Sequence, residues 1–217
     1  MPRDVVAFDL DGTLVSNDSF VPFLLRVIYR RPGCWVRSWS LPFAYLWHKL
    51  GQRDNSWLKI YFLKRIVGGL PCDQLQALGE TYARELRSSF RAAALEQINH
   101  HKAQGDFIVL ATASPDVYVD PLAKLLEFDL CVCTRLAEVA GQFTGELVDG
   151  NCYGDNKLVQ IKRALLARDY HRIDVAYSDH HADLPLLLDA QKPVVVSPSS
   201  KFEHFCAAQN FEISRWD

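Results

Sequence analysis

Val5-Val6-Ala7-Phe8-Asp9-Leu10-Asp11-Gly12-Thr13-Leu14 is the stretch of this sequence that decides the fold. An apolar run leads to two aspartates and then breaks at Gly12. The run predicts a buried strand over residues 5–10, and side chains two apart on a strand share a face, so Asp9 and Asp11 are expected to point the same way. Two carboxylates at the end of a buried strand are unfavourable unless a cation or a proton balances them. The stretch therefore predicts a functional site or, more simply, an Asp-Gly-Thr turn.

The composition is that of a globular protein with one sizeable domain or a core with a smaller satellite. The chain has 217 residues, of which 49% are hydrophobic and 23% charged, and its net charge is −2. This net charge gives no excess of positive charge for binding nucleic acid. The sequence has no run of about 18 apolar residues, so no membrane-spanning helix is predicted. The six cysteines have neither a C-x-x-C pair nor zinc-ligand spacing, and no signal peptide is recognisable. We therefore expect reduced thiols in a cytoplasmic protein.

Short apolar runs alternate with helical patterns along most of the chain. After the first strand, further strands are expected over 107–111, 131–134, 174–178 and 193–196, with a hairpin after 131–134 and helices between the strands. Such alternation predicts a parallel sheet covered by helices on both faces, which is an α/β, Rossmann-like core.

A helical block interrupts this alternation between the first strand and the second. Several short helices are expected over 20–70, and apolar residues at helical spacing predict one long helix over 72–103. We therefore expect residues 18–103 to form an inserted helical cap domain, and residues 1–17 together with 104–217 to form the core.

Polar residues stand where strands of the expected core end or where a helix begins. They are Asp9 and Asp11; Thr112 with Ala113; Lys157; and Asp179 with Asp183. The turn after Thr112 continues with Ser114 and Pro115, which suit the cap and the first position of a helix. Because the carboxyl ends of parallel strands meet at one edge of the sheet, these groups are expected to converge on one crevice.

The converging groups suit one kind of chemistry. Three or four carboxylates make a hard oxygen site suited to Mg²⁺. A hydroxyl and backbone amides at a helix N-terminus can hold a phosphate, and a lysine balances its charge. One carboxylate is then free to attack phosphorus, while a second protonates the leaving oxygen and later activates water. Thr112, Lys157 and Asp183 also have simpler explanations, as a turn hydroxyl, a solvated lysine and a helix cap.

Four stretches of the sequence stand in an order that is known from other proteins. Phe8-Asp9-Leu10-Asp11-Gly12-Thr13, the turn at Thr112, Lys157 and the Asp179…Asp183 pair resemble the four motifs of the haloacid dehalogenase (HAD) superfamily, over nearly the whole chain. The resemblance implies that Asp9 is the nucleophile and a metal ligand, and that Asp11 is the acid/base and gives the metal its backbone carbonyl. It also implies that Thr112 and Ala113 bind the phosphoryl group, Lys157 steadies it, Asp179 binds Mg²⁺, and Asp183 supports the metal shell or orients Lys157.

The helical insertion between the first two motifs resembles the C1 cap of the phosphoserine-phosphatase-like branch, subfamily IB, and the run over 134–157 also looks like that branch. The fourth motif reads Ser178-Asp179-His180-His181-Ala182-Asp183. Ala182 replaces the Asn that phosphoserine phosphatases often have before the last Asp, which weakens phosphoserine as the substrate. Histidine suits softer metals than Mg²⁺, so His180 and His181 are expected to be exposed or to face the substrate.

Residues 20–70 are both aromatic and basic. The basic residues are Arg26, Arg30, Arg31, Arg37, Lys49, Arg53, Lys59, Lys64 and Arg65, opposed only by Asp54, and the tryptophans are Trp35, Trp39, Trp47 and Trp57. Three explanations stay open: an ordinary cap with solvated cations, a surface that binds anionic phospholipid, or a site for a polyanionic soluble substrate. In being apolar and basic, the segment resembles the caps of HAD-type phosphatidylglycerophosphate phosphatases.

These observations together predict a Mg²⁺-dependent phosphatase that hydrolyses a phosphomonoester through phospho-Asp9, with a small phosphorylated substrate and no nucleic-acid partner. One alternative is a phosphatase that acts on phosphatidylglycerophosphate at the inner face of the membrane, with peripheral contact through residues 20–70. A phosphomutase would use the same groups. An alternative of another class is a receiver-like phospho-acceptor or a non-catalytic binding module, for which Asp11 and the large helical insertion would be unnecessary.

Overall fold

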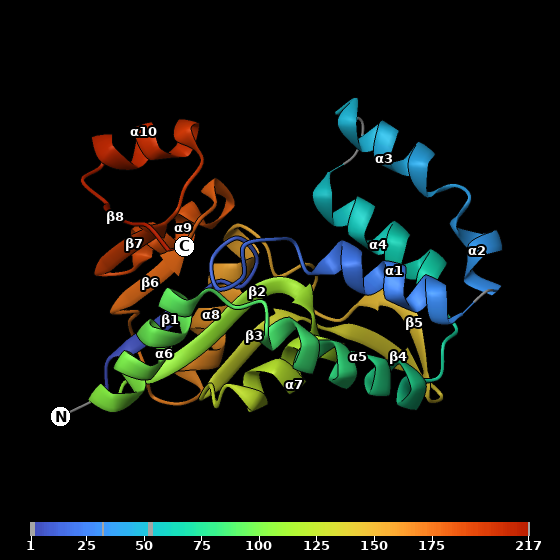
Figure 1. Cartoon of the computed structure of the whole chain (residues 1–217), viewed down its shortest axis with the longest axis horizontal. Helices are drawn as coiled ribbons and strands as arrows, with labels where there is room; N and C mark the ends of the chain where they lie inside the picture. Colours follow the sequence, from blue (N-terminus) through green and yellow to red (C-terminus); the bar gives the residue numbers. More distant parts are fainter. Residues whose placement is uncertain (1–2, 32, 52–53, 217) are drawn as a thin grey trace.

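Figure 1 shows the computed structural model of the chain, which describes residues 3–31, 33–51 and 54–216. The strands are β1 (Val5–Phe8), β2 (Phe107–Pro115), β3 (Leu130–Thr134), β4 (Leu136–Val139), β5 (Gln142–Leu147), β6 (Val175–Ser178), β7 (Lys192–Val196) and β8 (Glu212–Ser214). The helices are α1 (Phe20–Arg30), α2 (Gly33–Ser38), α3 (Leu41–Lys49), α4 (Asn55–Ile66), α5 (Cys72–Arg87), α6 (Ala92–Gln104), α7 (Asp116–Leu125), α8 (Asp155–Leu166), the short 3-10 helix η1 (His181–Asp183), α9 (Leu184–Asp189) and α10 (Ser200–Ala208). Arg53 of the basic segment lies outside the described residues.

Six strands form one parallel sheet in the order β3-β2-β1-β6-β7-β8. Strand β1 lies in the centre, where Phe8 pairs with Leu110 of β2 on one side and with Tyr177 of β6 on the other. This register places the residues that follow Phe8, Leu110 and Tyr177 next to one another at one edge of the sheet.

Alternate side chains of the central strands pack into two hydrophobic cores. Val6 and Phe8 face a core that includes residues of α5, α6 and α7, while Val5 and Ala7 face a core that includes residues of α8, α9 and α10. Each strand residue therefore buries its apolar side chain against helices on one face or the other. The prediction of an α/β, Rossmann-like parallel sheet with helices on both faces is confirmed.

Helices α5 and α6 both pack against the part of the chain that was expected to form the core. A Cβ at Gly79 of α5 would stand 1.9 Å from the carbonyl oxygen of Val117 in α7, so the two helix backbones are in direct contact. Helix α6 lies against β2, and its Ala94 and Ile98 are buried in the same core as Phe8. The packing therefore groups α6 with the sheet, although the expected cap ran to residue 103. The division into cap and core stays a prediction.

The antiparallel hairpin β4–β5 extends beyond the sheet and supports α4. A Cβ at Gly145 of β5 would stand 2.5 Å from the Cα of Lys64 in α4, so only glycine lets the two backbones approach this closely. Helices α2 and α3 pack on α4 in turn. In Figure 1, helices α1 to α4 lie beside the sheet at the end where the hairpin extends.

Two strands differ in length from the sequence-based expectation by more than one residue. Strand β1 ends at Phe8 rather than at residue 10, because the chain turns at Asp11, which bridges to Val15. The alternation of side chains therefore does not apply to Asp9 and Asp11. Strand β2 continues to Pro115 rather than ending at residue 111, so Ser114 lies in the strand and does not cap α7; Pro115 is the residue just before that helix.

The long helix expected over 72–103 is two helices, α5 and α6. They are separated where Phe90 bridges to Val15 and the backbone N–H of Arg91 donates to the carbonyl oxygen of Leu14. The apolar spacing runs on through this break because Phe90 is buried by contact with a distant part of the chain rather than by a helix face. Helix α10 and strand β8 had no counterpart in the sequence-based expectation. In the described residues, no helix is both long and apolar enough to span a membrane.

Candidate active site

Asp9 lies directly after the central strand and is buried. Its backbone N–H donates to the carbonyl oxygen of Tyr177, which continues the pairing of β1 with β6. Its Oδ1 accepts a 2.8 Å hydrogen bond from the ammonium group of Lys157, and its Oδ2 lies 3.3 Å from the hydroxyl of Thr13. The end of the sheet therefore holds the Asp9 carboxylate between a cation and a hydroxyl.

Lys157 joins two carboxylates in the interior. It lies in the first turn of α8, its side chain is buried, and it donates hydrogen bonds to Asp9 and to Asp183, the latter at 2.7 Å. Asp183 also accepts a 2.8 Å hydrogen bond from the hydroxyl of Ser178. Burial lowers the pKa of Lys157, but the charges of Asp183 and Asp9 raise it by more, so the ammonium group stays protonated.

Asp179 follows β6 and faces the turn after β1. Its backbone N–H donates to the hydroxyl of Thr13 at 3.0 Å, and its Oδ1 lies 3.1 Å from the same hydroxyl. Gly12 has a φ of +85°, and a Cβ there would stand 2.2 Å from Oδ2 of Asp179. Glycine at position 12 therefore allows the Asp179 carboxylate to pack against the turn that follows Asp9.

Asp11 has a different set of partners from Asp9. Its Oδ1 accepts a 2.7 Å hydrogen bond from the backbone N–H of Ser19, and its Oδ2 accepts one of 2.7 Å from the hydroxyl of Ser114. The Ser19 hydroxyl continues the network to Ser114 and to Tyr118, at 3.1 and 2.9 Å. Burial raises the pKa of Asp11, and the hydrogen bonds from Ser19 and Ser114 offset part of that rise. A carboxyl whose pKa is raised in this way suits the transfer of protons.

Thr112 and Ala113 lie within β2, beside the end of β1. The buried hydroxyl of Thr112 accepts a 3.1 Å hydrogen bond from the backbone N–H of Ser114. The carbonyl oxygen of Ala113 accepts hydrogen bonds of 2.6 Å from the hydroxyl of Thr134 and of 2.6 Å from the ammonium group of Lys59. Ser114 thus connects Thr112 to Asp11, and sequence patterns gave no sign of this role.

Lys59 is a further residue that the sequence pattern did not single out. It is on α4, and besides Ala113 it donates a 2.9 Å hydrogen bond to Oδ1 of the buried Asn151. Burial lowers the pKa of Lys59 to about 8, against the nearby charge of Asp11, which raises it. The helical segment therefore brings a cation to the edge of the sheet, where nine cations of residues 20–70 had looked alike in sequence.

The donors at this edge fit a hard divalent cation. Burial raises the pKa of Asp9 and raises that of Asp179 to about 6, and each of these pKa values is raised further by the nearby carboxylate of Asp183. A single hydroxyl, that of Thr13, stands between Asp9 and Asp179 and has one proton to donate. Carboxylate oxygens held close together without enough protons are the ligands that Mg²⁺ prefers. By contrast, His180 accepts a hydrogen bond at Nδ1 from the backbone N–H of Ala182, and both histidines are exposed.

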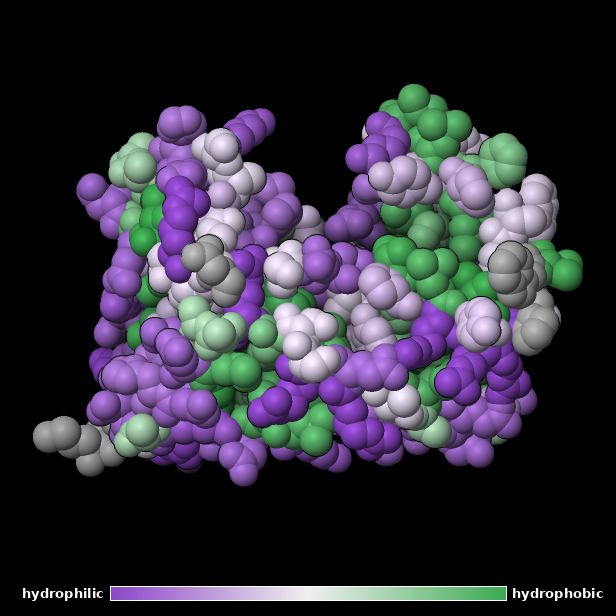
Figure 2. Space-filling view, viewed as in Figure 1, coloured by the Kyte–Doolittle hydropathy of each residue, from purple (hydrophilic) through white to green (hydrophobic). Residues whose placement is uncertain are grey.

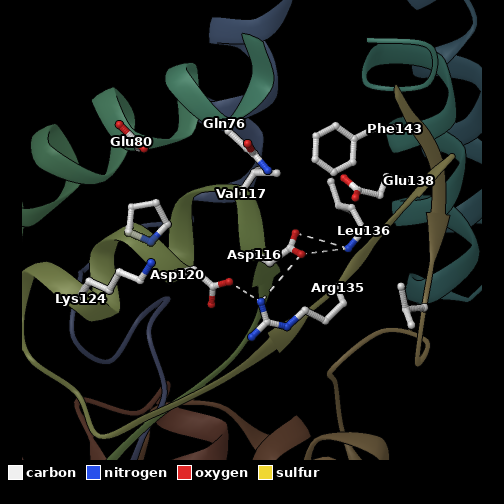
Figure 3. Close-up of a pocket in the computed structure, with 12 residues that line it drawn as sticks. Gln76, Glu80, Asp116, Val117, Asp120, Lys124, Arg135, Leu136, Glu138 and Phe143 are labelled. Atoms are coloured by element: carbon white, nitrogen blue, oxygen red, sulfur yellow. Dashed lines mark hydrogen bonds and ion pairs between the residues drawn. The ribbon is translucent and has the colours of Figure 1, made fainter. Parts of the chain in front are cut away.

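A cavity of about 620 Å³ lies elsewhere, between α5, α7 and the β4–β5 hairpin (Figure 3). Three of its charged groups are held together: Arg135 pairs with Asp116 and Asp120, and Asp116 also accepts from the backbone N–H of Leu136. Burial raises the pKa of Asp116 to about 6. These contacts join β4 to α7, and the residues lining the cavity include none of the carboxylates around Lys157.

The order and the placement of these residues agree with a known family. A model of the haloacid dehalogenase-like hydrolases matches residues 6–188. This chain belongs to that family. The match confirms the resemblance seen in the motifs, and it establishes the chain as a HAD hydrolase.

Proteins similar to this HAD hydrolase carry different names, and one of them is named as a phosphatase. Protein CicA of Caulobacter vibrioides is 30% identical over 194 residues, which are 87% of this chain and 83% of CicA. Phosphoserine phosphatase SerB1 of Mycobacterium tuberculosis is 28% identical over 223 residues, which are 98% of this chain and 71% of that protein. A solved structure of a protein of unknown function from Bordetella pertussis Tohama I shares the fold, with a TM-score of 0.84 at 22% identity over 98% of both chains.

Proposed function

We propose that this HAD hydrolase is a Mg²⁺-dependent phosphatase that hydrolyses a phosphomonoester through a phospho-aspartyl intermediate on Asp9. The observation that carries the proposal is the pair of hydrogen bonds by which Lys157 joins Asp9 and Asp183 at the centre of the sheet edge. In this proposal Asp9, Asp179 and the backbone carbonyl of Asp11 hold Mg²⁺, and Asp183 keeps Lys157 in place. Bound Mg²⁺ supplies positive charge that offsets the repulsion between a carboxylate and a phosphate.

The reaction divides between two carboxyl groups. A carboxylate oxygen of Asp9 attacks phosphorus, the bond from phosphorus to the leaving oxygen breaks, and Asp11 gives that oxygen a proton. Asp11 then takes a proton from water, whose oxygen attacks the phosphorus on Asp9 and releases inorganic phosphate. Thr112 and the backbone of Ala113 bind the phosphoryl oxygens, while Lys157 balances their charge.

The helical segment is proposed to act as a C1-type cap over this site. Lys59 connects α4 to Asn151 and to Ala113, where the phosphoryl group is proposed to bind, which supports a role for the segment in choosing the substrate. A small phosphorylated metabolite is the substrate class we propose first. A phospholipid-type substrate, such as phosphatidylglycerophosphate, is the second candidate, because α3 exposes a row of apolar side chains.

The test is release of inorganic phosphate from p-nitrophenyl phosphate with and without Mg²⁺. We expect turnover with Mg²⁺, its loss on chelation, and a loss of at least about 10³-fold in Asp9→Asn. Asp73→Asn, at an exposed position in the first turn of α5, is the matched control and should keep full activity. A folded protein that accepts a phosphoryl group on Asp9 but never turns over would instead support the receiver-like alternative.

A further inference from the structure

Helix α3 carries a row of exposed apolar side chains that we call the α3 surface. It consists of Trp39, Phe43, Leu46, Trp47 and Leu50, whose exposed fractions lie between 54% and 68%. The spacing of three to four residues places all five on one side of the helix and its two flanking turns. Figure 2 shows green, hydrophobic residues gathered at the top of the lobe that carries α3, opposite α10. Soluble proteins rarely leave so contiguous an apolar patch uncovered unless it meets a partner.

The side of α3 that faces α4 is already packed against that helix, so the α3 surface is not the side that the fold buries. Ala44 is buried and Leu41 is half-buried, where α3 packs on α4. Between the two helices lies an apolar groove of about 380 Å³, which Trp57 and Tyr61 of α4 line together with residues of α3. Trp39, Phe43 and Trp47 of the α3 surface also line this groove. Apolar side chains therefore lie on the exposed side of α3 and also where it faces α4.

The chain on both sides of α3 is mostly basic. Residues 20–54 contain six arginines and lysines, and the exposed Asp54 is the only acidic residue among them. Arg26 pairs with Glu85 of α5, and Arg37 donates to the carbonyl oxygens of Gly68 and Lys64, whereas Arg30 and Lys49 are exposed. An apolar patch with the exposed Lys49 on the same helix, in a segment with an excess of positive charge, complements a membrane whose headgroups are anionic and whose interior is apolar.

We propose that the α3 surface docks this protein on an anionic phospholipid bilayer, with Trp39 and Trp47 inserted at the level of the headgroups. Tryptophan is favoured there because one side of the ring is apolar and its N–H can stay hydrated. A second copy of the chain fits less well, because a symmetric contact through this patch would bring the same cations face to face. The docking depends on α3 alone and does not rest on the proposed catalysis.

The experiment is co-sedimentation of the full chain with vesicles of phosphatidylcholine alone and of phosphatidylcholine with phosphatidylglycerol. We expect binding to the anionic vesicles at low salt, weaker binding as salt rises, and little binding to the neutral ones. Trp39→Ala with Trp47→Ala should weaken the partition by about tenfold or more, because the apolar area that enters the interface is lost. Asp9→Asn should bind as the unaltered protein does, which separates docking from catalysis.

The control removes equally exposed apolar side chains from a distant helix. Val159→Ala with Leu166→Ala on α8, where the exposed fractions are 61% and 57%, should leave vesicle binding unchanged. The circular dichroism spectrum and thermal unfolding of the α3 variant, compared with those of the unaltered protein, test its folding. The proposal is wrong if the unaltered protein stays in solution with anionic vesicles, or if both double variants bind equally well. It is also wrong if the α3 substitutions abolish a dimer in vesicle-free solution, which would make the partner a second copy.

Discussion

Lys157 donates a 2.8 Å hydrogen bond to Asp9, a residue that precedes it by 148 positions in the chain. The same ammonium group bonds to Asp183 at 2.7 Å, and all three side chains are buried. An interior cation between two carboxylates stabilises the fold only while every member is present, because the removal of one leaves a buried charge without a partner.

Lys157→Met tests this dependence with a side chain of similar length and no charge. We expect the free energy of unfolding to fall by about 3–5 kcal/mol, measured by urea denaturation without metal. Lys162→Met, on the same helix, removes a half-exposed ion pair with Asp189 and should change stability by less than about 1 kcal/mol. Equal effects of the two substitutions would contradict the role given to Lys157.

Gly12→Ala tests the space that the turn leaves to Asp179. The added Cβ would stand 2.2 Å from Oδ2 of Asp179 at a residue whose φ is +85°, so both strain and displacement of the carboxylate are expected. Gly105→Ala is the matched control, because Gly105 has a φ of +80° with nothing within 4 Å of the added atom. The control should lose about 1 kcal/mol from the left-handed backbone alone. Gly12→Ala should lose more and should also bind Mg²⁺ more weakly, as read by titration calorimetry.

The stability of the metal-free protein should depend on pH in an unusual direction. Burial raises the pKa of Asp179 to about 6 in the folded protein, above the ordinary value of 3.8. The folded state therefore binds this proton more tightly, and the free energy of unfolding should rise, by on the order of 1 kcal/mol, as pH falls from about 6 towards 4. Urea denaturation at several pH values would show it, and Asp179→Asn should reduce the slope. Saturating Mg²⁺ should add stability at pH 7, where the carboxylate is ionised, and lose that effect below pH 6.

Ser114→Ala tests the proton-transfer role proposed for Asp11. The hydroxyl of Ser114 donates a 2.7 Å hydrogen bond to Asp11 and lowers the pKa of that carboxyl. Without it the pKa of Asp11 should rise, so the limb of the pH–rate profile that reports the protonated acid should move to higher pH. Ser88→Ala, whose hydroxyl donates only to its own helix end at Glu85, should leave the profile unchanged. A loss of activity with no shift of the profile would argue that Asp11 does not transfer the proton.

Lys59→Met tests whether α4 recognises the leaving group of the substrate. The ammonium group is within 2.9 Å of both Ala113 and Asn151, and it is near enough to Asp11 for that charge to raise the pKa of Lys59. We expect kcat/KM to fall about tenfold or more for a substrate with an anionic leaving group, and to change much less for p-nitrophenyl phosphate. Lys64→Met, an exposed neighbour on the same helix, should affect neither substrate. Equal losses on both substrates would indicate that Lys59 supports the fold of the site rather than its selectivity.

The sequence predicted those parts of the molecule in which a local residue pattern directly reflects how the segment packs in the fold. Alternating apolar strands and helices predicted the sheet, because a parallel strand buried on both faces is a short apolar run. Asp9, Lys157 and Asp183 were found through the order of the motifs and meet as hydrogen-bonded partners. Chain order carries this information because each lies directly beyond a core strand or at a helix start.

The parts that were not predictable depend on contacts between distant residues. Phe90 continues a helical spacing, yet it pairs with Val15 and separates α5 from α6. The partners of Asp11 are Ser19 and Ser114, ordinary residues whose role arises only when the turn after β1 meets β2. Lys59 was one of many cations in its segment, and its contacts with Ala113 and Asn151 join residues far apart in the chain, which no local pattern reveals.

The close approaches at Gly79 and Gly145 decide how the lobe of helices beside the sheet can move. Backbone meets backbone at both positions, between α5 and α7 and between α4 and β5, so a swing of the whole lobe would press these chains together. Helices α2 and α3 are outside both contacts and rest on α4 from one side. Helices α2 and α3 can therefore shift on α4 while both close approaches stay as they are. A surface that holds α3 from outside would meet the part of the lobe that these contacts do not fix.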